Sequence, residues 1–98
     1  MIKYYKILSK SGVILYVKTD TKKMETIEIC CIGNNPYKMN INKNQYYSYD
    51  NRKLTLESES FTYDKDFVSF KKITEEKFNE FLSLIKNNEF LSLIKIEL

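Results

Sequence analysis

The feature that most constrains this chain is an eight-residue segment near its end that occurs twice. Residues 79–86 read Asn-Glu-Phe-Leu-Ser-Leu-Ile-Lys, and residues 88–95 repeat the same letters. The second copy begins nine residues after the first. In one straight helix each residue advances about 100°, so nine residues turn the second copy by about 180° relative to the first. The apolar stripes of the two copies then lie on opposite sides of the helix, and only one of them can cover the core of the same chain.

The first copy lies in a segment with clear signals for the start of a helix. Thr74 can cap the first turn, and Glu75 and Glu76 suit the positive end of the helix dipole. We therefore predict a helix over residues 75–86. Its buried face is expected to consist of Phe78, Phe81, Leu82 and Ile85.

The second copy, within residues 88–98, is compatible with two structures. The asparagine pair that starts at Asn87 can end the first helix in a left-handed conformation. A kinked or second short helix is favoured, and a strand is the alternative because apolar and charged residues alternate at the end of the chain. As a helix, the segment has one apolar stripe of Phe90, Leu91 and Ile94. We predict that this stripe binds a partner protein or a second copy of the chain.

Most of the chain before the helix alternates between apolar and polar residues, as strands do. The alternating segments are residues 3–8, 13–19, 25–32, 53–57, 61–63 and 67–72. Residues 37–51, rich in asparagine and tyrosine, are interpreted as a long surface loop or an irregular edge, with a possible short strand at 45–49. The predicted fold class is α+β. One domain of residues 1–98 has a curled antiparallel sheet of five or six strands, within residues 2–73, with the helix packed on one face.

Length and charge restrict the classes of function. A chain of 98 residues fits one domain with a modest core. The net charge of +3 is small for a nucleic-acid-binding protein, and Arg52 is the only arginine available for phosphate or guanine recognition. The N-terminal residues form no apolar run of the kind found in signal peptides or membrane spans. We therefore expect a cytoplasmic protein without membrane contact.

Catalysis is not expected, because the chain contains no histidine and so lacks the commonest general base and metal ligand. No cofactor and no metal site are predicted. Cys30 and Cys31 are adjacent in a predicted strand, so Cys31 is expected in the core and Cys30 outside. Two reduced thiols are a simpler interpretation than a redox pair. Asp64 and Asp66 are interpreted as turn residues at a hairpin tip in preference to cation ligands.

Two Tyr-x-Lys pairs lie on the first predicted hairpin and are candidate binding residues. By alternation, Tyr4, Lys6, Tyr16 and Lys18 are expected to share the outer face of the sheet. A face with aromatic rings and ammonium groups suits a protein partner, in whose interfaces tyrosine is enriched. The same face is compatible with single-stranded nucleic acid, which stacks on aromatic rings. A third interpretation is that such pairs follow from composition and only stabilise the sheet.

A small isolated domain of this composition, without a catalytic constellation, resembles in type the accessory proteins of phages and mobile elements, including inhibitors of host defence. The favoured function is that of a non-catalytic protein-binding domain, which can act as such an inhibitor and can form a homodimer through residues 88–98. The alternative is a module that binds single-stranded nucleic acid through the tyrosine- and lysine-bearing face.

Overall fold

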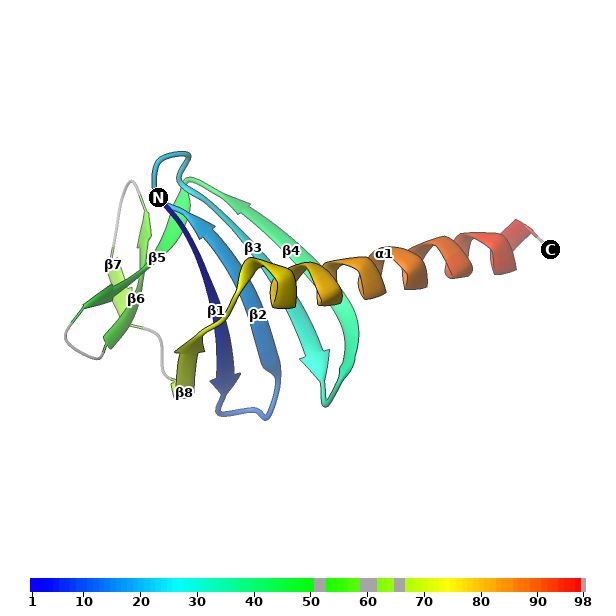
Figure 1. Ribbon diagram of the computed structural model, residues 1–98, viewed down its shortest axis with the longest axis horizontal. Coiled ribbons are helices and arrows are strands. Elements are labelled where there is room, and N and C mark those ends of the chain that lie inside the picture. Colours follow the sequence, from blue (N-terminus) through cyan, green and yellow to red (C-terminus); the bar gives the residue numbers. More distant parts are fainter. Residues whose placement is uncertain (51–52, 59–61, 65–66, 98) are drawn as a thin grey trace.

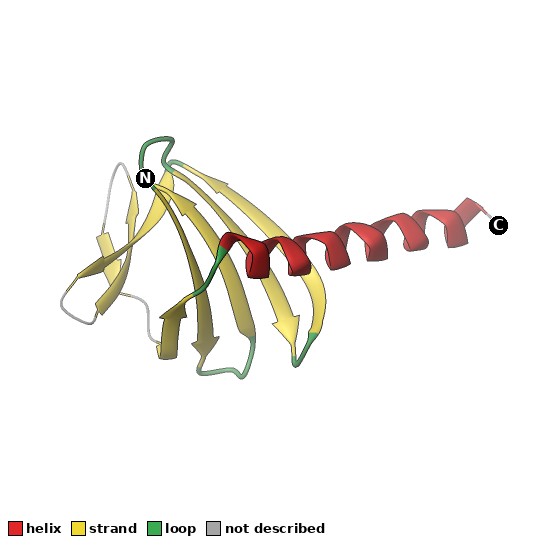
Figure 2. Cartoon of the chain, in the orientation of Figure 1, coloured by secondary structure: helices red, strands yellow, loops and turns green. Residues whose placement is uncertain are grey.

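The computed structural model describes residues 1–50, 53–58, 62–64 and 67–97 of the chain. Five strands form one antiparallel sheet in the order β4-β3-β2-β1-β8. Their bounds are β1 (Ile2–Ser9), β2 (Ile14–Asp20), β3 (Glu25–Ile32), β4 (Asn35–Lys43) and β8 (Phe67–Lys72). A second antiparallel sheet has the order β5-β6-β7, with β5 (Gln45–Asp50), β6 (Lys53–Ser58) and β7 (Thr62–Asp64). One helix, α1 (Glu75–Glu97), follows β8 (Figures 1 and 2).

The structure confirms the α+β class and a five-stranded antiparallel sheet with a C-terminal helix. That sheet is open, with β4 and β8 at its edges, so the predicted curl is not confirmed. A long loop over residues 37–51 is wrong, because β4 pairs with β3 over most of its length. The alternative of an irregular edge agrees with the structure, since β4 is an edge strand whose register shifts opposite Cys30 and Cys31, and β5 contains the possible strand at 45–49. In β4 the apolar residues Met39 and Ile41 alternate with asparagines, which are uncommon in strands, so the strand pattern is weak. Met39 and Ile41 lie opposite Ile29 and Ile27.

Helix α1 begins where the sequence predicts. The backbone N–H of Lys77 donates to Thr74 Oγ1 at 3.1 Å, which is the hydrogen bond of an N-cap. The predicted end at Lys86 is wrong, since the helix continues without interruption to Glu97. An asparagine inside a helix costs only about 0.7 kcal/mol relative to alanine, so Asn87 permits a helix end without requiring one.

The first half of α1 packs on one face of the five-stranded sheet. Phe78, Phe81 and Ile85 are buried against Tyr16 and other residues of β2 and β3. Leu82 is partly buried at the border of the same cluster, so the predicted face of the helix is confirmed. Each fully buried apolar side chain of this size contributes roughly 1.5–3 kcal/mol to folding.

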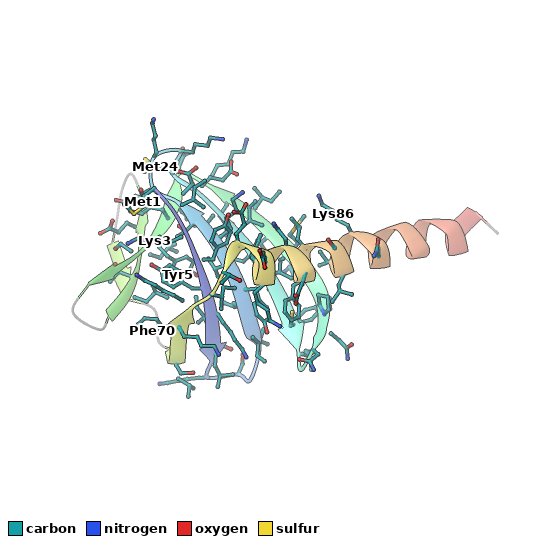
Figure 3. The ribbon with its side chains drawn as sticks, in the orientation of Figure 1. Met1, Lys3, Tyr5, Met24, Phe70 and Lys86 are labelled. Carbon is teal, nitrogen blue, oxygen red and sulfur yellow. The ribbon has the colours of Figure 1, made fainter. Side chains whose placement is uncertain are left out.

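The three-stranded sheet covers the opposite face of the five-stranded sheet. Tyr5, Ile7 and Val17 are buried there against Tyr47 and Leu54. Figure 3 shows Tyr5 and Phe70 on this side of β1 and β8. The central strands are therefore buried on both faces, which the sequence did not predict.

A chain of hydrogen bonds joins the two sheets through their buried threonines. The backbone N–H of Tyr47 donates to Thr19 Oγ1 at 2.8 Å, and Thr26 Oγ1 donates to the carbonyl oxygen of Gln45 at 3.1 Å. The two threonine hydroxyls lie 3.1 Å apart. Since the hydroxyl proton of Thr26 is donated to Gln45, Thr19 must donate to Thr26, so both threonine hydroxyls act as donor and as acceptor.

Thr19→Val is expected to lower the free energy of unfolding by about 1–3 kcal/mol, because valine keeps the shape and leaves the N–H of Tyr47 buried without an acceptor. A urea titration followed by circular dichroism measures the change. Thr21→Val is the control, since the hydroxyl of Thr21 bonds only at the surface. Equal losses for the two variants would show that the buried hydroxyl does not stabilise the contact between the sheets.

Candidate binding surfaces

The structure brings together the four candidate residues on the first hairpin. Tyr4 lies opposite Lys18 and Lys6 opposite Tyr16, so the four share one face, as predicted. Helix α1 covers that face. Tyr16 is only 2% exposed, and its ring stacks on Phe81 with 3.9 Å between centroids and 15° between planes. The prediction of a solvent-facing ring is therefore wrong for Tyr16, which is part of the core.

A signal in the sequence conflicted with that prediction. Cys31 is expected in the core, and Ile29 shares its face of the strand by alternation. The antiparallel register places Tyr16 directly opposite Ile29. Directly opposed residues of an antiparallel pair point to the same face. A core position for Ile29 therefore requires a core position for Tyr16.

Of the other three residues of this set, Tyr4 and Lys6 lie beside the docked helix, and Lys18 lies toward the end of β2, near Asp20 and Glu25. The ring of Tyr4 is 5.5 Å from that of Phe78 and tilted by 49°. Burial raises the pKa of the Tyr4 hydroxyl, and the nearby carboxylate of Glu75 raises it further. Lys6 and Lys18 are half-buried, and Lys6 Nζ lies 6.0 Å from the centroid of the Tyr16 ring. Tyr4 thus stabilises helix docking, and Lys6 remains accessible at its border.

Both cysteines are buried free thiols. Cys31 packs in the cluster beneath α1, as predicted. The prediction of an outside position for Cys30 is wrong, because the three-stranded sheet covers that face. Cys30 is only 7% exposed. Burial, followed by the neighbouring Cys30, raises the pKa of Cys31 to about 11. Burial also raises the pKa of Cys30, so both groups are expected to stay protonated at neutral pH.

The thiols of the folded protein are expected to react slowly with a disulfide reagent. A pKa of about 11 instead of 9.0 lowers the thiolate fraction of Cys31 at pH 8 about 100-fold. The variant Cys30→Ser isolates Cys31, and the absorbance of the released thiol follows the reaction. In urea the same variant should react at the rate of an ordinary cysteine. Rapid labelling without denaturant would mean that the cluster beneath α1 opens readily.

The raised pKa of Cys31 also predicts the direction of a pH effect. The unfolded chain releases this proton near its ordinary pKa of 9.0, whereas the folded chain keeps it until about 11. Stability is therefore expected to fall as pH rises through this interval, because the unfolded state binds fewer protons.

The last part of α1 extends beyond the sheet. The helix passes over β2, β3 and β4 and ends clear of both sheets (Figure 1). Residues 88–97, which we call the overhang, span about 15 Å at a rise of 1.5 Å per residue. The buried residues of the first copy all precede this segment.

Because α1 is continuous, the half-turn between the two copies of the repeat applies directly. The positions of Phe90, Leu91 and Ile94 fall on the side of the helix opposite to the stripe that packs on the sheet. Leu84 lies on the same side of the helix, one heptad before Leu91, and its side chain is 45% exposed. In the described part of the chain, neither sheet therefore lies against this side of the overhang.

The sheet edge beside the overhang is also apolar. Tyr37 and Ile41 of β4 are 53% and 54% exposed. Strand β4 pairs with β3, and no other described strand pairs with its second side. An exposed edge strand with apolar side chains, beside a helix end that extends past the sheet, is typical of a surface that another protein covers.

The described residues contain no cluster of side chains suited to a metal ion, and Asp66 lies outside them. No helix in this part of the chain combines the length and the apolar character needed to cross a bilayer. The chain matches no protein-family model, no curated protein and no solved structure.

Proposed function

We propose that this protein is a non-catalytic protein-binding domain that presents the overhang to a partner. The observation that supports this function is the continuation of α1 past β4, away from both sheets (Figure 1). Apolar residues at Phe90, Leu91 and Ile94 would form an exposed patch of a kind that soluble monomers avoid. A partner that covers the overhang removes this patch from water.

Recognition by this surface follows the mode in which an amphipathic helix lies in an apolar groove. The anchors are Phe90, Leu91 and Ile94, with Leu84 extending the stripe toward the sheet. The simplest partner is a second copy of the chain, because a two-fold arrangement lets each overhang cover the other. Tyr37 and Ile41 on β4 would enlarge the contact.

Light scattering of the intact chain tests this function. We expect a dimer, and we expect the double variant Leu91→Gln, Ile94→Gln to be a monomer with an unchanged circular dichroism spectrum. The matched control is Ile32→Gln, Val68→Gln, which removes two exposed apolar residues elsewhere and should remain dimeric. An intact chain that is monomeric at high concentration would exclude the second copy, and failure to retain any protein from the native host would exclude other partners.

Single-stranded nucleic acid is the alternative ligand, and the burial of Tyr16 reduces the support for it. A base cannot stack on that ring while Phe81 occupies its face. We expect labelled oligothymidylate to bind weakly or not at all at physiological salt, as measured by fluorescence anisotropy. Tight binding that falls steeply with added salt would make nucleic acid the favoured ligand.

An inhibitory role in a phage or mobile element is one use of such a domain, and the type of sequence alone supports it. A cytoplasmic location is likewise a prediction, made from the absence of an apolar run in the N-terminal residues. Both are tested by the identity and the location of the protein that is retained on the intact chain and lost with the Leu91→Gln, Ile94→Gln variant.

A further inference from the structure

A groove lined by lysines lies where β1 and β8 meet the start of α1. It consists of two cavities of about 340 Å³ each, which share Lys6 and Lys71. The first cavity is otherwise lined mainly by Leu8, Ile14 and Phe70, and the second by Tyr16 and Ile73. The lysines of this groove, which we call the lysine groove, are Lys6, Lys71, Lys72 and Lys77.

Two of these lysines face each other without a compensating charge. Lys6 on β1 lies directly opposite Lys71 on β8. Like charges at directly opposed positions destabilise a sheet. Within the described part of the chain, no carboxylate forms an ion pair with either ammonium group. A ligand with negative charge would remove this repulsion.

The stacked rings of Tyr16 and Phe81, between α1 and the sheet, help to position two of the ammonium groups. Lys6 Nζ lies 6.0 Å from the ring centroid of Tyr16, and Lys77 Nζ lies 5.4 Å from that of Phe81. These rings stack on each other. Cation–π attraction therefore restrains both lysines beside a rigid element of the core. Lys77 also contacts Glu80 at 3.4 Å, in an exposed pair that a ligand can replace.

Strand β8 offers a backbone beside these charges. It is an edge strand that pairs with β1, and no described strand pairs with its other side. Its residues Val68 and Ser69 are exposed. An extended peptide can bind such an edge through main-chain hydrogen bonds, and its alternate side chains then face the same side of the sheet.

We propose that the lysine groove binds an extended acidic peptide segment of a partner protein, which adds to β8 on the side with which no described strand pairs and directs its carboxylates toward Lys71, Lys6 and Lys77. The charge of the groove and the open edge together favour this ligand. A nucleic acid fits less well, because the ring of Tyr16 is stacked on Phe81 and the groove has ammonium groups in place of guanidinium groups. The lysine groove is separate from the overhang and adds a second binding surface.

The probe is a short fluorescent peptide of alternating glutamate and valine, whose anisotropy is measured with the intact chain. We expect Lys6→Gln, Lys71→Gln to weaken binding about tenfold or more, since it removes the two opposed charges. The control Lys22→Gln, Lys38→Gln removes the same net charge from exposed positions on other elements and should change affinity about twofold or less. Equal effects of the two double variants would overturn the proposal, as would a peptide that does not bind.

Three further probes separate the parts of the proposal. A peptide with glutamine in place of glutamate should bind weakly, and equal affinity would overturn recognition by charge. A peptide with alternate backbone nitrogens methylated should also bind weakly, and equal affinity would overturn addition to β8. Oligothymidylate that binds more tightly than the acidic peptide would assign the groove to nucleic acid. The variant Leu91→Gln, Ile94→Gln should bind the peptide normally, so failure of the overhang and failure of the lysine groove are distinguishable.

Discussion

Replacing Phe81 with alanine is expected to lower the free energy of unfolding by about 3–5 kcal/mol. The side chain is 6% exposed, and its ring stacks on Tyr16 at the centre of the contact between α1 and the sheet. Alanine would leave a cavity there, and the surrounding strands are too well paired to close it. A urea titration followed by circular dichroism measures the loss.

The matched control for this variant is Ile32→Ala at the end of β3, outside the proposed binding surfaces. Ile32 is 66% exposed, so its replacement should change stability by less than about 1 kcal/mol. A loss of less than about 1 kcal/mol for Phe81→Ala would mean that α1 packs through a different face. The double variant with Tyr16→Ala gives a sharper measurement, because stacked rings should show a coupling of about 0.5–1.5 kcal/mol.

The start of α1 was predictable because its signals are local. Thr74 caps the helix and two glutamates occupy its first turn, and both features act within a few residues of the boundary. The first hairpin was predictable for the same reason. Gly12 adopts a positive φ of 87° in the turn between β1 and β2, where the sequence required a residue of this kind.

The burial of both sheet faces depends on contacts between distant parts of the chain, and it was missed. Tyr47 and Leu54 reach Val17 only after β5 and β6 have folded back onto the sheet. One signal in β2 did indicate it. Apolar residues occupy both faces of that strand, with Ile14 on one and Leu15 on the other, as in strands that are covered on both sides.

The same dependence on tertiary contacts explains why the predicted binding site was only partly correct. Alternation correctly grouped Tyr4, Lys6, Tyr16 and Lys18 on one face, because the period of a strand is a local property. Which face the helix covers is decided by the whole sheet. Tyr16 therefore became a core residue, whereas Lys6 contributes to the lysine groove at the border of the helix.

The largest effect on assembly is expected from truncation after Asn87. The shortened chain should remain folded, because Phe78, Phe81 and Ile85 all precede the cut and keep their contacts with the sheet. It should lose the partner that the overhang binds and behave in light scattering as a smaller species than the intact chain. Thermal unfolding followed by circular dichroism tests whether the fold is retained.

A second variant separates the apolar stripe from the length of the helix. In it, residues 88–98 are replaced by a polar sequence with high helix propensity, which preserves the helix and removes the anchors. If the stripe is the binding surface, this variant should have the oligomeric state of the truncated chain, the helix content of the intact chain and a thermal stability close to that of the truncated chain. If both variants instead unfold at a much lower temperature while the intact chain is monomeric, residues 88–98 stabilise their own domain. That result would replace the partner with an intramolecular contact, because a binding surface that faces away from the sheet cannot stabilise the isolated monomer.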